Sequence, residues 1–148
     1  MITKQKVDFT NFSQKLLDFQ EALKKHAPGL VSAYLFGSSA QGDMKPLSDI
    51  DIALLFDKAV EYKFIETNIL IDAMRILGTE EIDLVVLNEA PLHLRYSILR
   101  NKRIIFCSDP IKRVNFETDS IMEYLDFRHI RQLYNREFLR KIKVGGAI

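Results

Sequence analysis

The chain of 148 residues has only one cysteine, Cys107, so it cannot form a disulfide bond within itself. It also lacks the clustered Cys and His residues of a zinc site. Its apolar runs are far shorter than the ~20 residues that a membrane-spanning helix needs. Residues 1–8 lack the apolar core of a signal peptide. These absences argue against disulfide-stabilised, zinc-dependent and membrane-spanning proteins, and we expect a cytoplasmic location.

The net charge of +1 conceals an uneven distribution of charged residues. Residues 31–99 hold eleven Asp or Glu against five Lys or Arg, whereas residues 100–148 hold eleven Lys or Arg against six Asp or Glu. The hydrophobic fraction of 47% is enough for a core, and we expect a single domain over residues 1–148. An acidic centre suits a metal site. The basic C-terminal part either meets phosphates or an acidic partner, or is a solvated helix face.

The most informative segment covers residues 36–56, with the sequence FGSSAQGDMKPLSDIDIALLF. Residues 30–36 and 50–56 are short and apolar, and turn residues bound them, so we predict two strands. A Gly-Ser turn follows the first strand, and Asp49 and Asp51 stand at the start of the second. Because side chains alternate along a strand, the two carboxylates share one face.

Two neighbouring carboxylates repel each other unless a cation lies between them. Magnesium is the natural cation, because it takes oxygen ligands and is usually held by one or two carboxylates plus substrate phosphates. Gly37 permits a close approach of the backbone, and Ser38 offers a hydroxyl and an N–H to a phosphate. Residues 38–41 could form a short helix whose N-terminus faces the same anion.

A site with two metal ions calls for a third carboxylate. Residues 81–87 form another candidate strand, and Asp83 is our first choice because apolar residues flank it on both sides. Glu81 has the same parity and is the alternative. In a two-metal scheme, one ion activates the attacking oxygen and both stabilise the charge on the transferred phosphorus.

The rest of the sequence predicts an α/β (α+β) fold with a mixed sheet of about four strands flanked by helices. Apolar spacing predicts helices over about 11–27, 65–76 and 92–99, a strand over 103–107 and a helical tail over about 110–143. The short link between the first two strands allows an antiparallel pair, whereas a helical crossover favours a parallel one.

The C-terminal tail carries an apolar stripe at three- and four-residue steps: Phe127, Ile130, Tyr134, Phe138 and Ile142. We expect part of this tail to pack on the sheet of the domain itself. A small domain has little room to bury so wide a face, so we also expect part of the helix to bind another chain.

The spacing Gly37-Ser38-x10-Asp49-x-Asp51, followed by Asp83 on a later strand, resembles that of the polymerase-beta-like nucleotidyltransferases. Within them it is similar to the minimal nucleotidyltransferase (MNT) group, over about residues 30–107. The resemblance implies a mixed sheet flanked by helices, with the carboxylates on adjacent strands. It also implies transfer of AMP from ATP with the help of magnesium, as two ions.

The resemblance further implies a role for each residue of the motif. Asp49 and Asp51 would bind both metal ions, and Asp83 would bind the catalytic ion and help to activate the acceptor hydroxyl. Gly37, Ser38 and Ser39 would hold the triphosphate.

The chain departs from many of these relatives at one position. They carry Arg directly after Gly-Ser, whereas this chain has Ser39. Lys45 could take over the phosphate contact of that Arg, or it is simply a solvent-exposed loop residue.

Many members of the MNT group are antitoxins that accompany an RNase toxin of the HEPN type. The resemblance implies addition of AMP to a tyrosine of such a toxin. The toxin motif is an Arg followed at short distance by His, and no Arg stands five to seven residues before His26, His93 or His129. The chain therefore does not resemble the toxin. Two alternatives remain: transfer to a small molecule, as in aminoglycoside nucleotidyltransferases, and neutralisation of the partner by contact alone.

Overall fold

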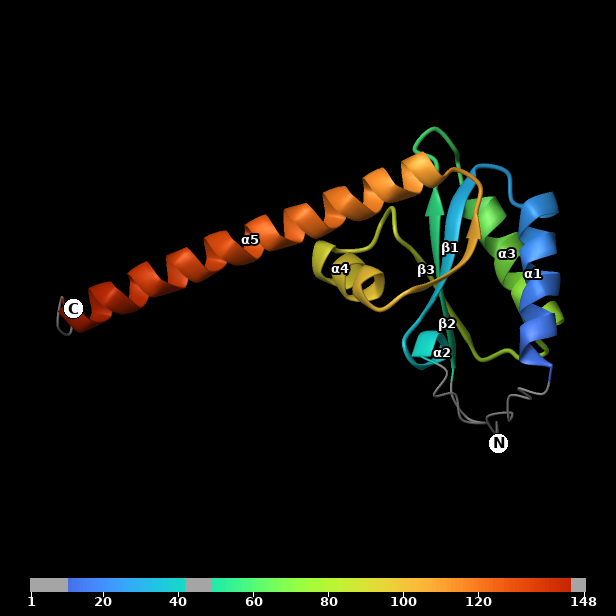
Figure 1. Ribbon diagram of the computed structural model, residues 1–148, viewed down its shortest axis with the longest axis horizontal. Helices are drawn as coiled ribbons and strands as arrows, with labels where there is room; N and C mark the ends of the chain where they lie inside the picture. Colours follow the sequence, from blue (N-terminus) through green and yellow to red (C-terminus); the bar gives the residue numbers. More distant parts are fainter. Residues whose placement is uncertain (1–10, 42–48, 145–148) are drawn as a thin grey trace.

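The computed structural model describes residues 11–41 and 49–144 (Figure 1). Helices and strands alternate along most of the chain, as the sequence predicts. They are α1 (Phe12–His26), β1 (Leu30–Phe36), α2 (Ser38–Gln41), β2 (Ile50–Phe56), α3 (Lys63–Leu77), β3 (Ile82–Val86), α4 (Leu92–Arg100), β4 (Arg103–Cys107) and α5 (Pro110–Val144). Each predicted element is present, with its ends shifted by at most a few residues.

The four strands form one mixed sheet in the order β3-β2-β1-β4. β1 runs antiparallel to β2 and to β4, and β2 runs parallel to β3. The parallel pair is joined through α3, because a parallel connection needs a crossover that returns the chain to the same end of the sheet. The predicted mixed sheet flanked by helices is confirmed.

Helices cover both faces of the sheet. α1 and α3 lie on one face (Figure 1), where Phe19, Ile52 and Ala73 belong to one buried cluster. On the other face, α4 and the beginning of α5 cover a second cluster that includes Tyr34 and Ile98. The alternation of side chains along β2 therefore assigns Ile52 to the α1/α3 face and Ala53 to the α4/α5 face.

A buried network of polar side chains holds the first turns of α5 against the sheet. The Tyr34 hydroxyl donates a hydrogen bond to Oε1 of Glu117 over 3.0 Å, and the Ser32 hydroxyl donates to the Tyr34 oxygen over 2.8 Å. Arg113 contacts both carboxylate oxygens of Glu117 at 3.1 Å, and Nζ of Lys102 lies 3.4 Å from Oε2. Three partners thus compensate the burial of the Glu117 carboxylate.

The second half of α5 projects away from the sheet and the other helices (Figure 1). Every side chain from Leu125 to Ile142 is exposed; Phe127, Tyr134 and Phe138 keep 55%, 70% and 54% of their surface. Part of the tail packs on the domain as expected, but through Phe116 and Glu117 near the start of α5 and not through the apolar stripe, which stays exposed. None of the helices in the described ranges is both long and apolar enough to cross a membrane.

Candidate active site

The predicted carboxylates meet where β2 and β3 begin. In the parallel register between these strands, Asp51 lies directly opposite Asp83. Neighbouring strands are about 4.8 Å apart, and residues in register point to the same face. Asp49 immediately precedes β2 and has the same parity as Asp51. The structure therefore brings all three carboxylates together, on the face of the sheet that α4 covers.

The electrostatics of Asp51 reflect this crowding. The pKa of the Asp51 carboxyl group is raised to about 6, mainly by burial, then by the negative charges of Asp83 and Asp49 and by a side-chain hydrogen bond to Asp83. Carboxylates that share a site normally raise one another's pKa, because the negative charge of one disfavours ionisation of the next. A cation placed among them would remove the conflict.

The turn after β1 completes one side of the cluster. Phe36, the last residue of β1, lies opposite Asp51 in the antiparallel register, and Gly37 follows with φ of 64° in the left-handed region. A Cβ atom at Gly37 would collide with Oδ2 of Asp51. Only glycine combines this backbone conformation with such a close approach. The sequence assigned no role to Phe36, although strand parity could have placed it beside the carboxylates.

The other predicted residues lie around the same end of the sheet. Ser38 begins α2, and Ser39 lies within it. Glu81, the alternative third carboxylate, precedes β3, and its backbone carbonyl accepts a hydrogen bond from the Ile50 amide over 2.9 Å. Asp83, rather than Glu81, acts on the pKa of Asp51. Lys45 lies outside the described residues.

The donor set suits a hard cation such as magnesium. Within the described ranges, no three His, Cys, Asp or Glu side chains form a group that could hold an ion by themselves. This finding is compatible with the crowding at Asp51, because magnesium is usually bound through one or two carboxylates together with waters and substrate phosphates. The oxygen atoms of these carboxylates are of the kind that magnesium takes as ligands.

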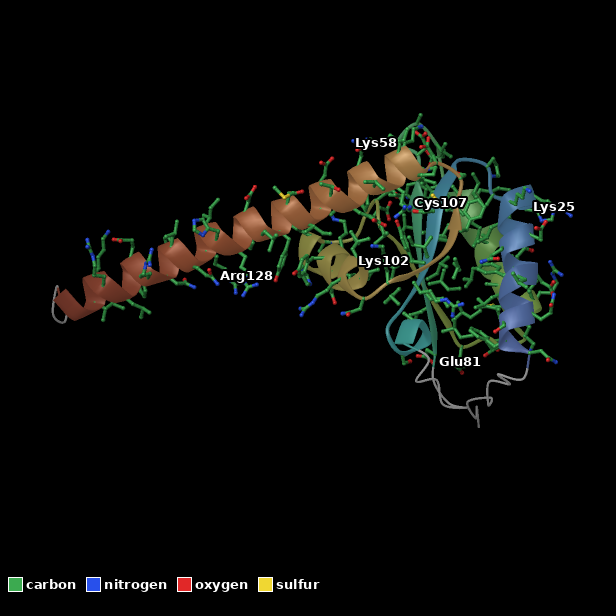
Figure 2. The ribbon with its side chains drawn as sticks, viewed as in Figure 1. Lys25, Lys58, Glu81, Lys102, Cys107 and Arg128 are labelled. Carbon is green, nitrogen blue, oxygen red and sulfur yellow. The ribbon has the colours of Figure 1, made fainter. Side chains whose placement is uncertain are left out.

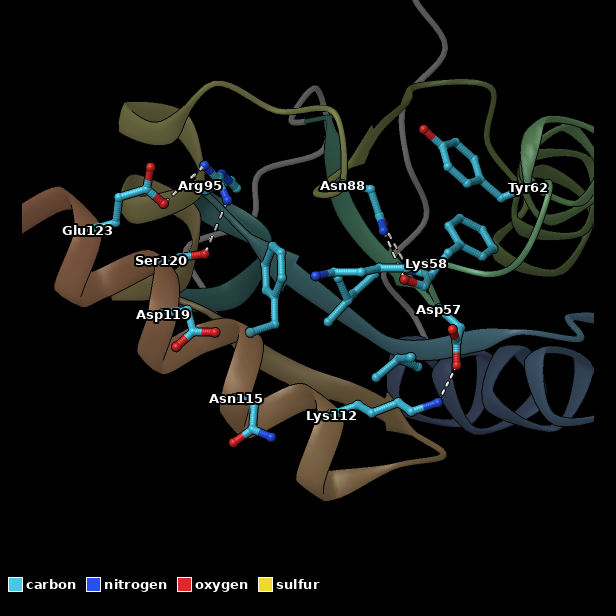
Figure 3. A pocket seen from close by; sticks show the side chains of 14 residues that line it. Asp57, Lys58, Tyr62, Asn88, Arg95, Lys112, Asn115, Asp119, Ser120 and Glu123 are labelled. Carbon is cyan, nitrogen blue, oxygen red and sulfur yellow. Dashed lines mark hydrogen bonds and ion pairs between the residues drawn. The ribbon is translucent and has the colours of Figure 1, made fainter.

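A cavity of about 630 Å³ lies elsewhere, where β2 ends and α5 begins (Figure 3). Phe56, Lys58, Tyr62, Arg95 and Phe116 are among the residues that line it. Asp51 and Phe56 lie five residue steps apart on β2, which corresponds to roughly 17 Å along the strand. Figure 2 shows the same separation, with Glu81 and Lys58 at opposite ends of the sheet. This cavity is therefore distinct from the carboxylate cluster.

Comparison with known proteins agrees with this geometry. The family model described as "Polymerase beta, Nucleotidyltransferase" matches residues 18–111, from within α1 to the start of α5. The match includes every carboxylate of the cluster and the turn at Gly37. No curated protein matches the sequence significantly.

Solved structures of toxin–antitoxin complexes share the fold. A chain from a toxin–antitoxin crystal structure with AMP-PNP has a TM-score of 0.64 and 24% identity, over 85% of this chain and 97% of that one. A chain from the complex of tri-AMPylated Shewanella oneidensis HEPN toxin with MNT antitoxin has a TM-score of 0.62 and 20% identity, over 86% and 98%. At these identities the likeness shows the fold.

Proposed function

The chain belongs to the polymerase beta nucleotidyltransferase family, and we propose that it transfers AMP from ATP to a hydroxyl group of a partner protein. The pairing of Asp51 with Asp83, with Asp49 beside them, carries this proposal. Such a cluster positions and neutralises phosphates through cations, which is most of what a protein contributes to phosphoryl transfer.

Each carboxylate has a role in the proposal. Magnesium ions bound there would activate the attacking oxygen and stabilise charge on the transferred phosphorus. Asp49 and Asp51 would hold both ions. Asp83 lies opposite Asp51 on the neighbouring strand, and it would bind one ion and help to activate the acceptor hydroxyl.

The turn after β1 is the proposed site of the triphosphate. Gly37 brings the backbone against Asp51, which leaves room for a phosphate beside the carboxylate oxygens. Ser38 and Ser39 would contribute hydrogen bonds to the phosphate oxygens at the start of α2. Ser39 stands where many relatives carry an arginine, so in this chain the phosphate charge would be neutralised mainly by bound metal ions.

The structural neighbours support the choice of nucleotide and acceptor. One was crystallised with AMP-PNP, an ATP analogue, and another is a complex of an MNT antitoxin with a tri-AMPylated HEPN toxin. We therefore propose that the acceptor is a tyrosine of a HEPN-type RNase toxin and that this chain is the antitoxin. The projecting half of α5 is the proposed docking element, because its apolar side chains are exposed.

The test compares enzymatic neutralisation with neutralisation by contact. Cells that express the protein of the adjacent gene would receive either the wild-type chain or the double variant Asp49→Ala, Asp51→Ala. We expect the wild type to restore growth and the double variant to fail while still binding its partner. Asp18→Ala on α1, an exposed carboxylate, is the matched control. Growth rescued by the double variant would favour contact alone.

A further inference from the structure

α4 and α5 separate at a defined point. The rings of Tyr96 on α4 and Tyr124 on α5 stack with centroids 3.9 Å apart and an angle of 11° between their planes. Tyr124 is half-buried, and every α5 residue that follows it up to Ile142 is exposed. The stacked pair therefore marks the place where α5 leaves the rest of the protein.

The face of α5 that packs on the protein continues beyond this point. Phe116, Ser120 and Tyr124 recur at four-residue steps, and Phe127 and Arg131 continue the same face at steps of three and four. Residues so spaced lie above one another on a helix. The face of α5 that packs on the protein before Tyr124 thus continues after Tyr124 as an exposed face.

A pocket of about 500 Å³ lies in the corner between the two helices. Leu92, Tyr124 and Phe127 give it apolar walls, and His93, Arg128 and Arg131 bring nitrogen donors to it. Figure 2 shows Arg128 on the projecting part of α5, beyond α4. None of the described residues that line the pocket carries a carboxylate. The corner thus combines apolar contact with uncompensated positive charge.

The charge of the projecting helix has the same sign. Residues 126–144 contain six Lys or Arg against two Asp or Glu. A surface of this kind attracts an anionic partner over several ångströms and favours one orientation of it. Nucleic acid is a poorer match than protein, because a phosphate backbone would leave the exposed side chains of Ile130, Leu139 and Ile142 in water.

We propose that the corner between α4 and α5 receives an acidic segment of the partner protein, with a carboxylate facing Arg128 and Arg131 and an apolar residue against Phe127. Arginine suits this task, since its planar guanidinium binds a carboxylate through two parallel hydrogen bonds. The inference rests on the proposed function in that the partner is the protein that accepts AMP.

The test is a binding measurement without ATP. Isothermal titration would compare the full-length chain with its Arg128→Glu, Arg131→Glu variant, using the protein of the adjacent gene as the ligand. We expect the double reversal to weaken binding about 100-fold, because each reversed charge replaces attraction by repulsion. The control is Lys24→Glu, Lys25→Glu on α1, which changes the net charge equally at exposed positions and should bind like the wild type.

Several results would overturn the proposal. Binding of the Arg128/Arg131 variant within threefold of the wild type, or an equal loss in the α1 control, contradicts an acidic anchor in the corner. Tighter binding of fluorescent single-stranded RNA than of the protein would identify nucleic acid as the occupant. A wild-type dimer that the reversal dissociates would identify a second copy of this chain.

The same samples separate this inference from the proposed function. Labelled AMP on the partner with normal binding by the Arg128/Arg131 variant would refute the docking site and leave the activity intact. Binding that depends on Arg128 and Arg131, without any label, would refute the activity and leave the docking site intact.

Discussion

The ionised Asp51 carboxylate, which the proposed activity needs, is unfavourable for the stability of the folded protein. The pKa of its carboxyl group is raised from 3.8 in the reference state to about 6, so the folded state holds the proton more tightly than the unfolded state. The free energy of unfolding therefore falls as the pH rises from about 4 through 6. A loss of stability of this kind is typical of functional sites, where charged groups are kept although they lower the free energy of unfolding.

Replacing Asp51 by Asn should stabilise the protein at pH 8 when divalent ions are removed. The raised pKa corresponds to roughly 3 kcal/mol, and solvent screening of a half-buried group reduces the expected gain to about 1–2 kcal/mol. Urea unfolding at pH 4 and pH 8 measures it, and the gain should vanish at pH 4. AMP transfer should be lost at the same time.

Asp57 provides a control of opposite sign. Its pKa is lowered, first by a hydrogen bond from Lys112 and then by one from the Ala59 amide. At pH values above the usual pKa of Asp, Asp57→Asn should therefore destabilise the protein by a small amount. The effect should disappear as the pH falls below that pKa. An Asp51→Asn variant no more stable than the wild type at pH 8 would contradict the electrostatic crowding of Asp51 by Asp83 and Asp49.

Gly37→Ala should reduce activity more than stability alone explains. Gly37 and Gly78 both have positive φ, 64° and 72°, so alanine at either position costs about 1–2 kcal/mol of backbone strain. Only at Gly37 does the new Cβ collide with the Asp51 carboxylate; at Gly78 the nearest atom is Nζ of Lys15 at 3.8 Å. We expect at least a tenfold lower kcat/KM for Gly37→Ala and wild-type kinetics for Gly78→Ala. Equal kinetics for the two variants would refute the role of Gly37.

At the scale of elements, the base of α5 should depend on the buried network around Glu117. Tyr34→Phe removes a hydroxyl that links Ser32 to Glu117 and should cost about 1–2 kcal/mol. Glu117→Ala leaves Arg113 and Lys102 without their shared carboxylate and should cost about 3 kcal/mol. Urea unfolding measures both, with the exposed Thr118→Ala as the control. Losses below about 0.5 kcal/mol would show that the network does not hold α5.

The sequence predicted the elements well for a physical reason. β1 and β2 are short, mostly apolar segments bounded by turn residues, and Gly78 ends α3 in a left-handed conformation, as expected for a helix C-terminus. The direction of α5 could not be predicted, because an apolar stripe looks the same whether it packs on its own sheet or on another chain. The Tyr34–Glu117 contact joins residues 83 positions apart, and no local pattern indicates it.

The candidate site was predictable only in part. Parity along a strand assigned Asp49 and Asp51 to one face, and a later strand offered Asp83 or Glu81. The register that sets Asp51 opposite Asp83 depends on how β2 and β3 pair, which parity does not determine. The corner residues His93, Arg128 and Arg131 were missed, since they come together only through the packing of α4 against α5.

At the scale of the whole molecule, the proposed catalytic site and the proposed docking surface lie in different parts of the protein. The carboxylates lie where β2 begins, whereas the second half of α5 extends away from the sheet (Figure 1). Substitutions on the projecting half of α5 can therefore alter the affinity for a partner without disturbing the carboxylates, because the projecting residues are exposed and take no part in the core.

Deletion of residues 128–148 should leave the protein folded and remove the partner's docking surface. We expect the free energy of unfolding to change by less than about 1 kcal/mol, since the deleted described residues are exposed. Deletion of residues 118–148 should cost more, because it also removes buried Ser120 and the ring of Tyr124. Thermal unfolding and titration with the partner measure these effects. Unchanged partner affinity after the shorter deletion would contradict docking on α5.

The most direct test of the central claim is label transfer from α-labelled ATP to the protein of the adjacent gene, with magnesium present. We expect label on the partner with the wild-type chain and none with the Asp49→Ala, Asp51→Ala variant. Absence of label with the wild type, while the two proteins still bind each other, would contradict the claim that this carboxylate cluster is an AMP-transferring site.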